Sequence, residues 1–173
     1  MTIERRKLAL AVALAAALGA HGSPAAATPS DAQRTAVQQA RRARTPVTLA
    51  EATSSVDPKT TRLRDVVGLL REDAGAALAA IDWSPLHLSR RYAVSASIVR
   101  LETTSTGTRS LASACSVSVA VRDLERGTLL FIVEGRARAE DGPDAAERAE
   151  RDALRAAVQN AIAAVPNGLK RAS

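Results

Sequence analysis

The chain is poor in the residues that carry most covalent and metal chemistry. Its 173 residues include one Cys and two His, and aromatic residues make up 2% of the sequence. A single Cys cannot form an internal disulfide, which excludes a disulfide-stapled fold. Zinc sites need clusters of Cys and His, and base stacking needs aromatic side chains. We therefore expect no metal and no nucleic-acid partner.

Familiar catalytic and phosphate-binding motifs are missing as well. The sequence contains no Gly-x-Gly-x-x-Gly, no Gly-x-x-x-x-Gly-Lys and no Gly-x-Ser-x-Gly. Without these motifs there is no phosphate-binding loop or nucleophile elbow of known type, and no cofactor is expected. The longest apolar run, Leu8–Ala20, has 13 residues. Because a membrane-spanning helix needs about 20 residues, a multi-span membrane protein is excluded.

The N-terminal residues have the pattern of a secretory signal peptide. Arg5, Arg6 and Lys7 precede the apolar run, and the small residues Ala25–Ala27 follow it. This order predicts a signal peptide over residues 1–27, cleaved near Ala27, and a periplasmic or secreted mature protein. A buried helix or an uncleaved anchor is the alternative interpretation. No Cys lies near the cleavage position, so we expect no stable membrane anchor after cleavage.

Charge gives little information about a ligand. Three basic residues and one acidic residue leave with residues 1–27, so the formal net charge falls from +6 to +4. The remaining basic side chains are scattered rather than gathered in a tract. Residues 28–45 are polar and rich in Ala, which predicts a flexible leader. A basic docking arm for an acidic surface is the alternative for this segment.

Residues 46–169 have the hydrophobic periodicity of one α+β domain. Apolar residues recur at steps of three and four over Thr60–Ile81, and again from Gly142 to a stop at Pro166–Gly168. Between these helices the period is two over 92–101, 111–121 and 129–139, with a slip after Ile98 that predicts a bulge. Residues 46–50 predict a further short strand, and Gly127 a turn at positive φ.

The predicted architecture follows from these periods. The element order is (β)-α-β-β-β-α, an antiparallel meander of three to four strands. Each helix has one apolar stripe, so both are expected to pack on one face of the sheet. Leu129, Phe131, Val133 and alternate residues after them are expected to face the core. Ser and Ala on the opposite face are expected to be solvated or to form a flat docking surface.

Few side chains are available for catalysis. The mature chain has one His, His87, and one Cys, Cys115, which alternation places toward the core. A Cys–His nucleophilic pair would need these two in contact, whereas buried Cys is usually inert. Glu134 lies two residues before Arg136 on a strand, so a surface ion pair explains it. No catalytic, cofactor-binding or metal-binding residue is assigned.

The stretch from Tyr92 to Val165 resembles a known group of envelope domains. It contains YAVSASI, then VAVRDLERGTLL, then EGRARA and an Ala/Val-rich helix. This order of strand, hairpin and closing helix is similar to outer-membrane activators of penicillin-binding proteins and to curli-secretion channel subunits. The resemblance implies an envelope accessory role. These families usually have a lipobox Cys, which is absent here, and no family site residue is carried over.

Three hypotheses for function follow. The first is a secreted or periplasmic non-enzymatic accessory or binding domain of the bacterial cell envelope, with an envelope protein as partner. The second is a small hydrolase or isomerase that uses Glu134 or His87. The third is a basic module that binds an anionic polymer or membrane surface through five arginines, Arg90, Arg91, Arg100, Arg109 and Arg122.

Overall fold

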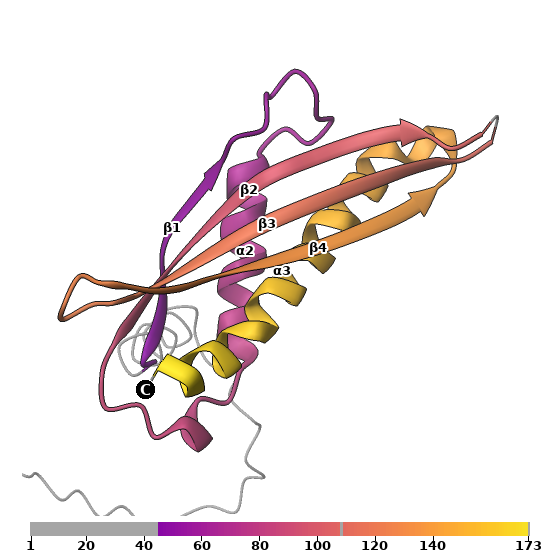
Figure 1. The fold of residues 1–173 in the computed structure, drawn as a ribbon. Helices are drawn as coiled ribbons and strands as arrows, with labels where there is room; N and C mark the ends of the chain where they lie inside the picture. Colours follow the sequence, from indigo (N-terminus) through magenta and orange to yellow (C-terminus); the bar gives the residue numbers. More distant parts are fainter. Residues whose placement is uncertain (1–44, 108, 173) are drawn as a thin grey trace, which may run out of the picture.

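The computed structural model describes residues 45–107 and 109–172, which form a four-stranded sheet and two long helices (Figure 1). The predicted signal peptide and nearly all of the predicted leader lie outside the described residues. The class is α+β, and the element order is the predicted one. The elements are β1 (Val47–Ser54), α2 (Val66–Ala80), the 3₁₀ turn η1 (Ser84–Leu86), β2 (Tyr92–Ser105), β3 (Leu111–Asp123), β4 (Leu129–Asp141), the 3₁₀ turn η2 (Pro143–Ala145) and α3 (Ala146–Ala172).

The strands lie in the order β1-β2-β3-β4. β2, β3 and β4 form the predicted antiparallel meander, and β1 adds to β2 in parallel. A parallel pair needs a crossover connection, which α2 supplies. The register of β2 shifts between Ile98 and Arg100, which confirms the predicted bulge.

Both helices cover the same face of the sheet, as predicted (Figure 1). Alternate residues of β2 and β3 point toward them, because side chains of a strand alternate between its two faces. The core combines these residues with the stripes of the two helices. Its fully buried side chains include Leu70, Val94, Ile98, Val117, Val119, Val121, Leu154, Val158, Ile162, Val165 and Leu169.

Helix α2 begins at Val66, six residues later than the periodicity predicted. The Asp65 carboxylate accepts a 2.8 Å hydrogen bond from the Gly68 backbone N–H, which caps the helix. Upstream, the Thr61 hydroxyl and the Arg62 N–H both donate to Glu150 on α3. These contacts hold residues 61–62 outside the helix even though Leu63 continues the apolar stripe.

Helix α3 continues past Pro166 to Ala172, so the predicted stop at Pro166–Gly168 is wrong. A proline inside a helix removes one backbone hydrogen bond and costs about 3 kcal/mol. Val165 and Leu169 on either side of it are fully buried. Burying a side chain of this size contributes about 1.5–3 kcal/mol, which offsets the cost of the proline. Neither described helix is long and apolar enough to cross a bilayer.

The first residues of β4 also depart from the prediction. The register shifts between Val121 and Arg122, so Arg122 pairs with Leu129 while Val121 pairs with Phe131. Leu129 is therefore exposed rather than buried, and Leu130 packs against the core instead. The preceding turn places Gly127 at φ +67°, the positive φ that was predicted.

Candidate binding face of the sheet

The face of the sheet opposite the helices has a floor of small side chains. On β2 and β3 it is formed by Ser95, Ser97, Ala114, Ser116, Ser118 and Ala120. Ser97 pairs with Ser118, which pairs in turn with Glu134 of β4. Because side chains at paired positions share a face, the floor runs directly into the side chains of β4.

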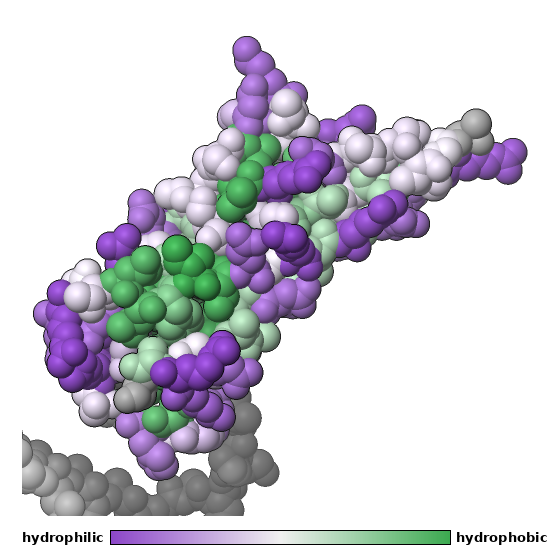
Figure 2. Space-filling model, in the orientation of Figure 1, coloured by the Kyte–Doolittle hydropathy of each residue, from purple (hydrophilic) through white to green (hydrophobic). Residues whose placement is uncertain are grey.

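Large apolar side chains stand at the border of this floor. Ile132 of β4 is 56% exposed, Val99 at the β2 bulge 55% and Leu129 at the start of β4 48%. Figure 2 shows hydrophobic residues gathered where β4 begins, with hydrophilic residues along its second half. We call the floor together with Ile132, Val99 and Leu129 the outer face.

The charged side chains that β4 directs to the outer face are paired along the strand. Glu134 and Arg136 form a 2.7 Å ion pair, and Arg138 and Glu140 one of 2.9 Å. The predicted pairing of Glu134 with Arg136 is thereby confirmed. All four side chains are more than half exposed, so each pair contributes only about 0–1 kcal/mol to stability.

A shallow hollow of about 340 Å³ lies within the outer face. Its lining comes from β2, β3 and β4: Val99, Arg100, Ser116, Val117, Glu134 and Arg136. Arg100 forms an ion pair with Glu102 on the same strand. The hollow thus combines an exposed apolar side chain with a rim of charges that already neutralise one another. Such a lining fits the surface of another protein better than it fits a free ion.

The outer strand β4 is protected against adding another strand along its middle. Asn160 of α3 donates a 3.0 Å hydrogen bond from its side-chain amide to the backbone carbonyl of Arg136. Alternating charged side chains occupy the same half of the strand. Both features discourage edge-to-edge pairing, so the face of the sheet is the more accessible surface for a partner.

The two residues named for a hydrolase or isomerase are not brought together. Glu134 lines the hollow of the outer face. His87 lines a different cavity, at the end of α3, with a left-handed backbone at φ +45°. Among the described residues, no group of three or more His, Cys, Asp or Glu is placed to hold a metal ion.

Cys115 faces the core, as its position in the strand predicted. The side chain is 2% exposed, and burial raises the pKa of its thiol to about 12. Since the thiolate is the nucleophile, a thiol of this pKa is unreactive near neutral pH. His87 is exposed, whereas Cys115 is buried in the core, so the geometry gives no support to a Cys–His pair.

The five arginines of the basic-module hypothesis do not form one patch. Arg109 lies in the turn between β2 and β3, at the opposite end of the sheet from Arg90, Arg91 and Arg122 (Figure 1). Arg90 forms a 3.1 Å ion pair with Asp123, and Arg100 is paired with Glu102. A continuous basic surface for a polymer is therefore not built from this set.

Two buried carboxylates were missed by the sequence reasoning. Glu150 is 2% exposed and Asp123 is 1% exposed. Glu150 lies four residues after the buried Ala146 and three before the buried Ala153, so the helical period itself marked it as core-facing. Asp123 ends β3 and binds the backbone of the following turn, a common role for Asp at that position.

No family model and no curated protein sequence matches the chain. Several solved structures are similar to part of it. A candidate lipoprotein from Caulobacter crescentus has 19% identity and a TM-score of 0.45, over 73% of this chain and 89% of that one. The hypothetical protein CT253 from Chlamydia trachomatis has 11% identity and a TM-score of 0.44, over 71% and 96%.

A PelC dodecamer from Paraburkholderia phytofirmans has 16% identity and a TM-score of 0.37, over 72% of this chain and 86% of that one. The lipoprotein GNA1162 from Neisseria meningitidis has 15% identity and a TM-score of 0.30, over 68% and 96%. Two of the four proteins are described as lipoproteins. All these TM-scores lie below 0.5, so no function is transferred from these proteins.

Proposed function

We propose that the protein is a non-enzymatic binding domain of the bacterial cell envelope that holds a protein partner against the outer face of its sheet. The observation that carries the proposal is the exposure of Ile132, Val99 and Leu129 beside a floor of small side chains. Protein interfaces bury exposed apolar side chains of this kind beside a polar rim. Glu134, Arg136, Arg138 and Glu140 supply that rim.

The charges of the outer face favour a protein over an anionic polymer as partner. The arginines of β4, Arg136 and Arg138, are paired with glutamates on the same strand, which leaves little net positive charge along β4. An anionic polymer would need a continuous excess of arginine or lysine. A partner that places an apolar side chain against Ile132 needs no such excess.

The envelope part of the proposal rests on the N-terminal pattern. A basic start, a 13-residue apolar run and small residues ending at Ala27 are typical of a signal peptide. We expect export followed by cleavage near Ala27. Fractionation of the source cells and N-terminal sequencing test this part, and a cytoplasmic protein that still begins at Met1 would refute it.

The partner is tested by photo-crosslinking in the envelope of the source bacterium. A photo-reactive phenylalanine analogue is placed at position 132, and at position 72 of α2 as the control, because the Glu72 side chain is also largely exposed. We expect one discrete protein adduct from position 132 and none from position 72. Competition with unlabelled protein should remove the adduct, whereas competition with Ile132→Asp should not.

Two results would refute the proposed surface. One is the same adducts from positions 132 and 72. The other is equal competition by the native protein and by Ile132→Asp. Because Ile132 is more than half exposed, Ile132→Asp is expected to fold, and circular dichroism checks this.

A further inference from the structure

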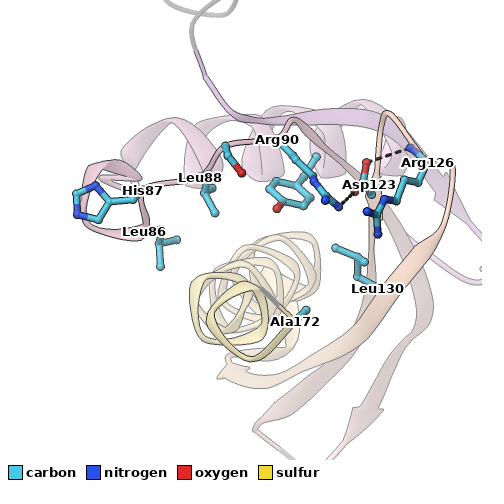
Figure 3. Close-up of a pocket in the computed structure, with 10 residues that line it drawn as sticks. Leu86, His87, Leu88, Arg90, Asp123, Arg126, Leu130 and Ala172 are labelled. Atoms are coloured by element: carbon cyan, nitrogen blue, oxygen red, sulfur yellow. Dashed lines mark hydrogen bonds and ion pairs between the residues drawn. The ribbon is translucent and has the colours of Figure 1, made fainter.

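A second cavity, of about 300 Å³, lies at the end of the core and shares no lining residue with the hollow of the outer face. It is bounded by the loop after η1, the first residue of β2, the turn between β3 and β4, and the last turn of α3. Figure 3 shows Arg90, Arg126 and Asp123 on one side of it, and Leu86 and Leu88 on the other. Tyr92, Leu130 and Ala172 complete most of the wall.

Asp123, the acidic side chain of the cavity wall, already has hydrogen-bond donors on both of its oxygens. One oxygen of Asp123 accepts hydrogen bonds from the backbone N–H groups of Glu125 (2.8 Å) and Arg126 (3.1 Å). The other accepts a 3.1 Å hydrogen bond from Arg90. Burial opposes ionisation of Asp123, but these donors outweigh it and lower the pKa of the carboxyl group. Asp123 is therefore a fixed anion that positions Arg90.

The two guanidinium groups retain unused donors. Each arginine has five N–H donors in a planar fork that matches a carboxylate. Within the described residues, Arg90 uses one donor on Asp123, and the Arg126 side chain forms no ion pair. The cavity thus holds two cationic groups and one anion. The carbonyl end of α3 works against an added anion, but Lys170 and Arg171 in its last turn offset this effect.

We infer that this cavity binds a carboxylate attached to a short apolar group, with the carboxylate on Arg126 and Arg90 and the apolar group against Leu86, Leu88 and Leu130. The terminal residue of a peptide and a short fatty acid share this chemistry. The site is separate from the outer face, so it does not depend on the partner proposed above.

The test is a titration of the purified full-length chain followed by ¹H–¹⁵N NMR. N-acetyl-leucine represents a peptide terminus and hexanoate a fatty acid, each added up to about 10 mM, a range that detects weak binding. We expect saturable shifts for residues of the 86–92 and 123–130 segments with at least one of them. The ligand giving the lower dissociation constant identifies the source. N-acetyl-leucinamide, which lacks the charge, should bind at least about tenfold more weakly, the effect of losing a charge-assisted hydrogen bond.

Arg126→Gln is the decisive variant because the Arg126 side chain is exposed and supports no other contact named above. It should weaken binding of the carboxylate by about tenfold or more, whereas the matched variant Arg109→Gln at the other end of the sheet should leave it unchanged. Three results would overturn the inference: an equal loss of carboxylate affinity in the two variants, binding of N-acetyl-leucinamide as tight as that of N-acetyl-leucine, or no saturable shift with either carboxylate. Inorganic phosphate binding as tightly as both carboxylates would also overturn it, because the leucines would then contribute nothing.

Discussion

Glu150 of α3 accepts a 2.9 Å hydrogen bond from the hydroxyl of Thr103 on β2. The same carboxylate accepts from the Thr61 hydroxyl at 2.7 Å and from the Arg62 backbone N–H at 2.9 Å. Thr103 also shares a 2.8 Å hydrogen bond with the buried Ser113 of β3. One buried side chain therefore joins the segment before α2, the sheet and α3.

Replacing Glu150 is expected to destabilise the fold in proportion to the acceptors removed. Glu150→Ala leaves three donors without their acceptor and should lower the free energy of unfolding by about 2–4 kcal/mol. Glu150→Gln keeps one oxygen acceptor and the shape of the side chain, and should lower the free energy of unfolding by about 1 kcal/mol. Urea denaturation measures both, with exposed Asp152→Asn as the control. Equal stability of Glu150→Ala and the control would contradict this role.

Gly135 allows β4 to approach α3 closely. A Cβ atom at Gly135 would lie 2.0 Å from the carbonyl oxygen of Ala157, a backbone atom that cannot move alone. Gly135→Ala should therefore reduce stability by about 1–3 kcal/mol or more through overpacking. Gly142→Ala is the matched control, because nothing lies within 4 Å of its Cβ position and its φ is −67°. Thermal unfolding should separate the two variants, and similar melting temperatures would refute the close-packing argument.

Asp123 is expected to make stability sensitive to acid. Its pKa is lower in the folded protein than the value of about 3.9 for an unfolded chain, so its ionised form favours the fold. This contribution is complete above the unfolded pKa and is lost as the pH falls through the folded pKa.

Asp123→Asn should therefore differ most from the native protein at neutral pH. The difference in urea midpoint between Asp123→Asn and the native protein should be smaller near pH 3 than near pH 7. The reason is that the Asp123 carboxyl group of the native protein takes up a proton in acid. Asp141, whose pKa is also lowered, mainly by its hydrogen bond from Arg148, remains in both proteins and serves as a shared background. A difference independent of pH would contradict the prediction.

Cys115 is expected to resist thiol reagents until the protein unfolds. With a pKa of about 12, only about one part in 10⁵ of the thiol is ionised at pH 7, and the side chain is buried. Labelling with iodoacetamide should be slow in the native protein and rapid in urea. Cys115→Ala gives the background reading. Fast stoichiometric labelling of the native protein would mean that the core around β3 opens readily.

Local periodicity was enough to predict the class, the element order, the shared helix face and the bulge after Ile98. A period of two or of 3.6 decides which side chains share a face, and burial then forces those faces together. The alternation that placed Cys115 inside, and the spacing that paired Glu134 with Arg136, needed no knowledge of distant residues.

Several of the positions that the sequence missed depend on contacts between distant segments. Helix α2 begins at Val66 because Glu150 binds residues 61–62, which lie 88 to 89 positions away. Helix α3 passes Pro166 because the sheet and α2 bury the residues around it, and Leu129 turns outward because β3 and β4 pair with a shift. The cavity beside Arg126 forms only when the ends of α3, β3 and the η1 loop meet. The sequence by itself thus determined which faces are apolar. Only the tertiary structure decided where elements begin and end, because those boundaries are set by hydrogen bonds and burial that span the whole fold.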